Sequence, residues 1–270
     1  MNAQVASSHV IYELHEPRTP VLVSVPHAGT RLSEGLAARL MRAGRALPDT
    51  DWFVDRLWSW VTESGAGLLV ATHSRYVVDL NRPADDAPLY SGPTTGLVPV
   101  ETFAGESLYA EGAEPDTDDV ALRIEAYWRP YHDVLGGTLR AMHEHHGHAV
   151  LLDAHSIRSR VPRLFSGRLP DLNLGTWDGR SADPRLAERA EAVLADAEGF
   201  THVRDGRFKG GYTTRHYGCP AKGYHALQLE MAQASYMSEE PPTWDGERAA
   251  GVRPVLESLL RGLLDWRPGK

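Results

Sequence analysis

Two histidines that lie far apart in the chain each follow an apolar segment typical of a buried strand. His27 comes shortly after residues 21–25, and His155 comes shortly after residues 150–152. If these strands are neighbours in one sheet, both imidazoles lie at the same edge, where open α/β sheets bind ligands. Neutral imidazole is the commonest protein ligand for zinc, and a catalytic zinc site combines three protein ligands with one open position for water. The pair therefore predicts a metal site that activates water.

An acidic residue near the first histidine is the expected third ligand. Asp51 stands at the predicted start of a helix over residues 52–62, and Asp55 lies one turn later. A helix-capping role explains Asp51 equally well, because aspartate is a favoured residue at a helix N-terminus. The residue types alone leave Asp51 and Asp55 as alternatives.

A carboxylate on a later strand offers the base that such a site needs. In the predicted strand over residues 224–231, Gln228 and Glu230 share one face, and apolar residues occupy the other. A carboxylate in a buried strand is costly unless it is paired or functional. Glu230 is therefore either a general base or the partner of an arginine.

Arginines are concentrated in segments next to the predicted strands. Arg75, Asn81 and Arg82 lie in one such segment, and Arg158 and Arg215 lie in two others. An arginine fork binds a carboxylate through two charge-assisted hydrogen bonds, and a neighbouring amide can fix its orientation. In a chain of net charge −8, this concentration indicates a small anionic substrate.

The elements that must position these residues alternate between strands and helices. Strands are predicted over residues 21–25, 68–72, 75–83, 150–152 and 224–231, and helices over residues 33–44, 52–62, 118–146, 184–197 and 246–266. Residues 84–115 and 156–181 have the composition of loops, and the first of these is long enough to predict a functional role. The alternation predicts an α/β fold in which residues 1–270 form a single domain around a mixed, mostly parallel sheet.

Composition narrows the class of protein further. A chain of 270 residues can bury a large core, and its negative charge argues against a nucleic-acid partner. One cysteine excludes a disulfide framework, and no apolar run approaches the length of a membrane-spanning helix. No secretory pattern is visible near the N-terminus. We therefore expect a cytoplasmic protein without a membrane partner.

Two other groups of reactive residues are interpreted as structural. The histidine-rich tract at residues 143–148 lies at a predicted helix end, where solvated side chains are common. Cys219 lies near His216, but a proline follows it and no acid is placed to orient the histidine. Neither group predicts a second catalytic site.

Several segments match a known family in chain order. They read Val-Ser-Val-Pro-His-Ala-Gly at 23–29, Arg-Tyr-Val-Val-Asp-Leu-Asn-Arg-Pro at 75–83, Leu-Asp-Ala-His-Ser at 152–156, Gly-Gly-Tyr-Thr-Thr at 210–214 and Gln-Leu-Glu at 228–230. The chain thereby resembles the N-formylglutamate amidohydrolases, also called N-formylglutamate deformylases. The resemblance implies a three-layer α/β/α fold similar to zinc carboxypeptidases and aspartoacylases. It also implies one divalent metal ion, most simply Zn²⁺, and hydrolysis of N-formyl-L-glutamate in histidine degradation.

The family's functional residues can be carried over only where this sequence matches. The resemblance assigns His27 and His155 to the metal, Glu230 to acid–base catalysis, and Arg75, Asn81 and Arg82 to the substrate. Related carboxypeptidases use a His-x-x-Glu motif, but Thr30 stands where that glutamate would be. The acidic ligand must therefore come from elsewhere, and Asp51 suits the family pattern better than Asp55. Asp153 is then expected to support His155 from behind rather than to catalyse.

Two alternatives to this function are open. One is the same reaction on another amide, such as an N-acyl aspartate, a succinylated amino acid or a γ-glutamyl peptide. The other is a non-catalytic relative that binds carboxylates, which the missing His-x-x-Glu acid allows and Glu230 opposes.

Overall fold

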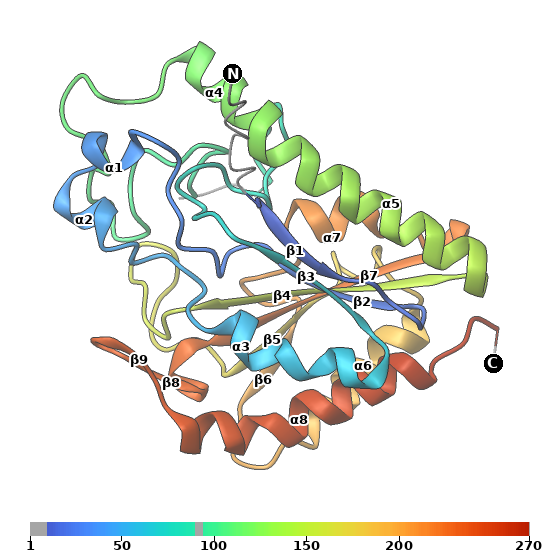
Figure 1. Ribbon diagram of the computed structural model, residues 1–270. Helices are drawn as coiled ribbons and strands as arrows, with labels where there is room; N and C mark the ends of the chain where they lie inside the picture. Colours follow the sequence, from blue (N-terminus) through green and yellow to red (C-terminus); the bar gives the residue numbers. More distant parts are fainter. Residues whose placement is uncertain (1–9, 90–93, 270) are drawn as a thin grey trace, which may run out of the picture.

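A computed structural model shows a seven-stranded mixed sheet with helices on both faces (Figure 1). It describes residues 10–89 and 94–269. The strand order is β1-β3-β2-β4-β7-β5-β6, and β8 and β9 form a separate two-stranded sheet. The strands are β1 (Tyr12–His15), β2 (Val21–Val25), β3 (Gly67–Ala71), β4 (Ala149–Ile157), β5 (Leu172–Gly175), β6 (His202–Arg204), β7 (Tyr224–Ala232), β8 (Met237–Glu239) and β9 (Pro242–Trp244).

Helices of very different length surround this sheet. The α-helices are α1 (Leu36–Arg39), α2 (Arg42–Arg45), α3 (Val54–Trp58), α4 (Thr117–Arg123), α5 (Arg129–His146), α6 (Pro184–Ala195), α7 (Tyr212–Tyr217) and α8 (Gly246–Asp265). Short 3₁₀ segments are η1 (Ser59–Ser64), η3 (Pro220–Lys222) and η4 (Gln233–Ser235), and η2 (Ile124–Trp128) is a π-helical stretch between α4 and α5. No helix of the described ranges combines the length and apolar character needed to cross a membrane.

The central strands run parallel and the outer ones vary. β3, β2, β4 and β7 are mutually parallel, whereas β1 is antiparallel to β3, and β5 is antiparallel to β7. This arrangement confirms the predicted mixed, mostly parallel sheet. β2 and β4 are direct neighbours, with Ser24 opposite Asp153, so the segments that carry His27 and His155 leave the sheet at the same edge.

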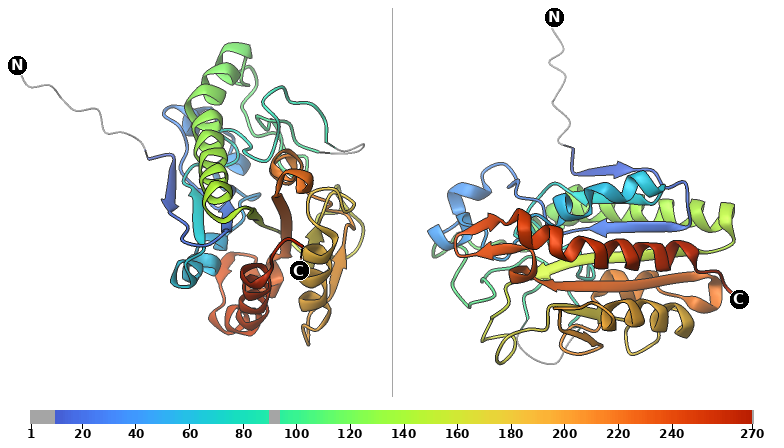
Figure 2. Two further views of the ribbon diagram at one scale, coloured as in Figure 1. Left: turned by 90° about the vertical axis from the view of Figure 1, so that its right-hand side faces the viewer. Right: turned by 90° about the horizontal axis from the view of Figure 1, so that it is seen from below.

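Alternate residues of the buried strands pack into two hydrophobic cores, one on each face of the sheet. Val21, Val23 and Val25 of β2 pack into the core formed with α3, α6 and α8, whereas Leu22 packs into the core below α5. The two further views in Figure 2 show helices on either side of the sheet. All five residues of β2 are buried, so both faces of the sheet are covered there, and the fold has the three layers that the family resemblance implied.

The face below α5 becomes polar towards the carboxyl ends of the strands. On β4 this face continues from Leu151 to Asp153 and His155, and on β7 it carries Gln228 and Glu230. The register places Gln228 opposite Asp153, and Glu230 opposite His155. Four polar side chains thus gather on one patch of an otherwise apolar sheet.

The prediction of a strand over residues 75–83 is wrong, because this segment forms a series of turns. The Asp79 carboxylate accepts hydrogen bonds from the backbone N–H of Asn81 at 2.9 Å and from the Arg75 guanidinium at 2.6 Å. These local bonds replace a strand ladder.

Other elements differ from the sequence prediction mainly in length. The predicted helix over residues 33–44 is divided into α1 and α2, and the helix over residues 52–62 is α3 followed by η1. Five short strands were not predicted: β1, β5, β6, β8 and β9. In the described part of residues 84–115 there is no helix or strand, as expected for the long loop.

Candidate active site

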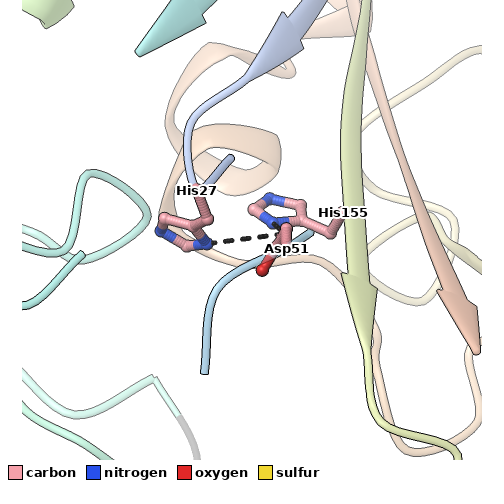
Figure 3. Close-up of side chains that lie close together, drawn as sticks. All are labelled: His27, Asp51 and His155. Carbon is pink, nitrogen blue, oxygen red and sulfur yellow. Dashed lines mark hydrogen bonds and ion pairs between the residues drawn. The ribbon is translucent and has the colours of Figure 1, made fainter. Parts of the chain in front are cut away.

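Three buried side chains converge at the carboxyl edge of the sheet (Figure 3). His27 follows β2, Asp51 precedes α3, and His155 lies near the end of β4. Asp51 Oδ2 lies 3.0 Å from Nδ1 of His155 and 3.9 Å from Nδ1 of His27. One possible ligand atom from each residue lies within 4.8 Å of the others. The two predicted histidines and Asp51 thus form one cluster, whereas Asp55 is an exposed residue of α3.

The cluster has the properties of a metal site. Nδ1 of His27 and Oδ1 of Asp51 are buried and have no hydrogen-bond partner among the described residues. Leaving such atoms unpaired is costly, and a cation between them would satisfy both. Two imidazoles and one carboxylate are a donor set typical of catalytic zinc sites. The residues present therefore fit one divalent ion.

Two further carboxylates contact the histidines at the ring nitrogen opposite the cluster. His27 Nε2 lies 2.8 Å from Asp79 Oδ1, and His155 Nε2 lies 2.9 Å from Asp153 Oδ2. A carboxylate can only accept, so each Nε2 carries a proton, and each ring turns Nδ1 towards Asp51. Nδ1 of His155, 3.0 Å from Asp51 Oδ2, carries a proton as well, and a metal ion bound there would displace it. Carboxylate–histidine pairs of this kind orient metal ligands. Asp153 therefore has the supporting position predicted for it.

Asp79 has the same supporting position, but sequence reasoning gave it no role. Its only signal was its presence in the matching segment at residues 75–83, because a turn gives no periodicity that would aim the side chain. Burial would raise the pKa of Asp79, but Arg75 and His27 outweigh it and hold the pKa well below the ordinary value. Asp79 is thus an anion that holds both an arginine and a histidine.

The two histidines differ in how readily they are charged. Burial, followed by the positive charge of Arg75, lowers the pKa of His27, which keeps that imidazole neutral. Burial also disfavours charge on His155, but Asp153 and Asp51 raise its pKa well above the ordinary value.

A cavity opens beside the cluster. The predicted site residues that line it are His27, Asp51, Arg75, Asn81, Arg82, His155 and Glu230. Arg158 and Arg215 do not line it. Arg158 borders a smaller space together with Asp49, and Arg215 donates to the backbone carbonyls of Gly210 and Leu89, both at 2.9 Å.

Glu230 reaches this cavity from β7. Burial raises the pKa of Glu230 to about 8, and Asp51 and Asp153 add to the effect, while His155 and Arg75 oppose it. No ion pair of Glu230 occurs in the described ranges, so the alternative role as an arginine's partner is not what the structure shows. A buried carboxylate with a raised pKa, facing a cavity, is typical of a general base.

Asn81 and Arg82, which were both predicted to bind substrate, have different environments. Asn81 is engaged within the protein, because its Oδ1 accepts from the Thr213 N–H at 2.9 Å. Its Nδ2 lies beside His155, whose Nε2 proton is directed at Asp153. Arg82 donates to the Thr94 hydroxyl and forms no ion pair within the described chain. Its guanidinium lines the cavity as a cation.

Two other arginines line the cavity besides Arg82. Arg75 donates to Asp79 at 2.6 Å and lies 3.7 Å from Asp51 Oδ1, so its charge is balanced by the acids around the histidines. Arg207 was not predicted; its Nε donates to the Leu164 carbonyl at 2.8 Å. It follows the three-residue strand β6, which no sequence pattern indicated.

Comparison with known proteins identifies the family. The sequence profile described as N-formylglutamate amidohydrolase matches residues 19–237. This chain belongs to the N-formylglutamate amidohydrolase family. A curated N-formylglutamate deformylase of Pseudomonas putida is 50% identical over 257 residues, which are 95% of this chain and 96% of the relative. Another, of Pseudomonas aeruginosa, is 52% identical over 92% of this chain and 94% of the relative.

Solved structures agree with this membership of the N-formylglutamate amidohydrolases. The crystal structure of N-formylglutamate amidohydrolase from Ralstonia eutropha JMP134 matches with a TM-score of 0.80 at 27% identity, covering 93% of this chain and 96% of that one. A gene product of Agrobacterium tumefaciens matches with a TM-score of 0.71 at 19% identity over 94% of both chains, which supports the fold alone. The family resemblance and the fold class predicted from sequence are both confirmed.

Proposed function

We propose that this protein is a metal-dependent amidohydrolase that converts N-formyl-L-glutamate and water into formate and L-glutamate. The observation that carries the proposal is one cavity that joins the His27–Asp51–His155 cluster, the carboxyl of Glu230 and arginines. Two relatives that are about half identical and carry the name N-formylglutamate deformylase support the substrate. A cytoplasmic location and a place in histidine degradation belong to the same proposal and rest on the sequence.

The metal ion would be held by Nδ1 of His27, the Asp51 carboxylate and Nδ1 of His155. A divalent ion at such a site polarises a carbonyl and lowers the pKa of water from about 15.7 to about 7. Asp79 and Asp153 fix the ring orientation that this binding requires.

Glu230 would move the proton in both halves of the reaction. Its carboxylate takes a proton from the attacking water as the new C–O bond forms at the formyl carbon. It then returns the proton to the nitrogen as the C–N bond breaks, which releases formate and the amine. Its burial beside the cluster supplies the raised pKa that suits a group which both accepts and donates.

Arg82 and Arg207 are proposed to bind the two carboxylates of the substrate. Both line the cavity, and a guanidinium binds a carboxylate through two parallel hydrogen bonds. Arg75 contributes differently, because Asp79 and Asp51 already surround its guanidinium. It keeps the acidic cluster electrically balanced and adds positive potential to the cavity.

The test is formate release from N-formyl-L-glutamate, N-formyl-L-aspartate, N-formyl-L-glutamine and N-acetyl-L-glutamate, with Zn²⁺ and after treatment with EDTA. We expect N-formyl-L-glutamate to have the highest kcat/KM and the chelator to abolish turnover until a divalent ion is restored. Tight binding without formate release would identify a non-catalytic carboxylate-binding protein. Full turnover by protein that contains no metal would overturn the metal mechanism.

A further inference from the structure

The amide of Gln228 has only one chemically sensible orientation. Its Oε1 lies 2.8 Å from the backbone nitrogen of Gly211, and its Nε2 lies 3.0 Å from Oε2 of Glu230. A backbone N–H can only donate, so the oxygen of the amide must face Gly211. The NH₂ group must then face Glu230 and donate to it. The Gly211 backbone therefore determines what Gln228 presents to the carboxylate.

The two oxygens of Glu230 are made unequal by this contact. Oε2 accepts from Gln228, whereas Oε1 accepts no hydrogen bond from the described residues. The side chain lines the cavity, so Oε1 is the oxygen left for a proton and for substrate. The last torsion of a glutamate is broad and roughly two-fold, so an isolated carboxylate would not hold one orientation.

The turn that orients Gln228 also orients a second amide. Gly211 donates to Gln228, and two residues later the Thr213 N–H donates to Oδ1 of Asn81 at 2.9 Å. Asn81 packs so closely that a Cβ on Gly211 would lie 2.4 Å from its Nδ2. Only glycine fits at position 211, and the beginning of α7 thereby connects the base on β7 with the Asn81 amide beside His155.

We propose that Gln228 is a positioning residue for the reaction: it holds Oε2 of Glu230 so that Oε1 faces the cavity. This inference rests on the proposed role of Glu230. Oε1 takes the proton from water and later gives it to the leaving nitrogen, while the Gln228 amide keeps its own protons throughout. A proton on Oε2 would oppose the N–H of Gln228, which disfavours the unproductive orientation.

The test uses Gln228→Met, Glu230→Gln and the double variant, because methionine keeps the length of glutamine without donor or acceptor. We expect Gln228→Met to lower kcat for N-formyl-L-glutamate at least tenfold and to change KM less than twofold. In the Glu230→Gln background the same change should lower kcat less than twofold, because the group on which Gln228 acts is already gone. Equal losses in both backgrounds would overturn the proposal.

Asn173→Leu provides the matched control. Asn173 lies opposite Glu230 on β5, and its Nδ2 donates to the backbone carbonyl of Glu230 at 3.0 Å rather than to the carboxylate. We expect this variant to lower Tm while kcat stays within threefold of the wild type. A tenfold loss of kcat in Asn173→Leu would mean that losing any amide near β7 is enough to lower kcat. That result would overturn the specific role of Gln228.

A crystal structure of Gln228→Met gives a readout that does not depend on turnover. We expect the Glu230 carboxyl to be rotated or to occupy more than one orientation, with β7 unchanged. A carboxyl fixed as in the wild type would overturn the proposal. If the wild type released no formate, the proposed function would fail, while the orientation of Glu230 would still be decided by this structure.

Discussion

Asp79 Oδ1 lies 2.8 Å from Nε2 of His27, on the side of the imidazole that faces away from the metal-ligand cluster. The same carboxylate binds Arg75 through its other oxygen at 2.6 Å. One buried anion thus orients a proposed metal ligand and anchors a cation next to it. Removing it should disturb the site although Asp79 is not one of the proposed metal ligands.

Asp79→Asn therefore tests the support of His27. The amide is of similar size, but it no longer carries the charge that fixes the imidazole and balances Arg75. We expect Zn²⁺ affinity to fall about 10- to 100-fold, measured by competition with a chromophoric chelator. Unchanged affinity in a folded variant would show that His27 needs no carboxylate behind it.

The third ligand can be decided with two aspartates that are close in sequence. Asp51 is 1% exposed and lies within the cluster, whereas Asp55 is exposed on α3. Asp51→Asn should lose stoichiometric zinc and lower kcat/KM at least a hundredfold, because one charged ligand is replaced by a poor one. Asp55→Asn is the control and should keep both the bound zinc and the kcat/KM of the wild type. Metal content by atomic absorption and formate release measure the two effects, and the reverse result would exclude Asp51 as the ligand.

The sequence was most informative where chemistry and strand geometry coincide. His155 and Glu230 could be predicted because period-two alternation assigns each to a polar position at the end of a buried strand, and the structure places them opposite one another. Asp79 and Arg207 could not be predicted in this way. One lies in a turn and the other in a loop, so no periodicity determines where their side chains point.

The short outer strands escaped prediction for a related reason. β5 and β6 contain four and three residues, which is too few for alternation to stand out from a polar loop. Their positions are determined by β7, which pairs with β5 along Leu172–Gly175. Long-range pairing of this kind cannot be inferred from a local pattern.

Arg207 and Arg82 should determine the preference for a dicarboxylate. Replacing Arg207 with Met removes one proposed carboxylate-binding group, so kcat/KM for N-formyl-L-glutamate should fall about 100-fold, and that for N-formyl-L-glutamine should change little. Arg160→Met is the control, because Arg160 is exposed and does not line the cavity. Equal losses on both substrates would mean that Arg207 does not bind the γ-carboxylate, which is the group that N-formyl-L-glutamine lacks. Arg82→Met should lower kcat/KM on both substrates, because both carry the α-carboxylate that Arg82 would then bind.

The raised pKa of Glu230 makes a prediction about stability that needs no substrate. Burial raises this pKa from an ordinary value of 4.5 to about 8. Between these values the folded protein binds more protons at Glu230 than the unfolded chain, so stability falls as pH rises, by up to about 1.4 kcal/mol per pH unit. This loss of stability is absent below pH 4.5 and complete above pH 8.

Glu230→Gln removes this titration and should therefore gain Tm over the wild type as pH rises from 5 to 8, with no further gain above pH 8. Calorimetry of both proteins in EDTA measures the difference. Added Zn²⁺ should reduce it, because a cation in the cluster favours the ionised carboxylate and lowers its pKa. The prediction fails if the difference in Tm is the same at every pH. Glu230 would then have the same pKa in the folded and unfolded chains. It would lack the raised pKa on which its proposed exchange of a proton with the substrate depends.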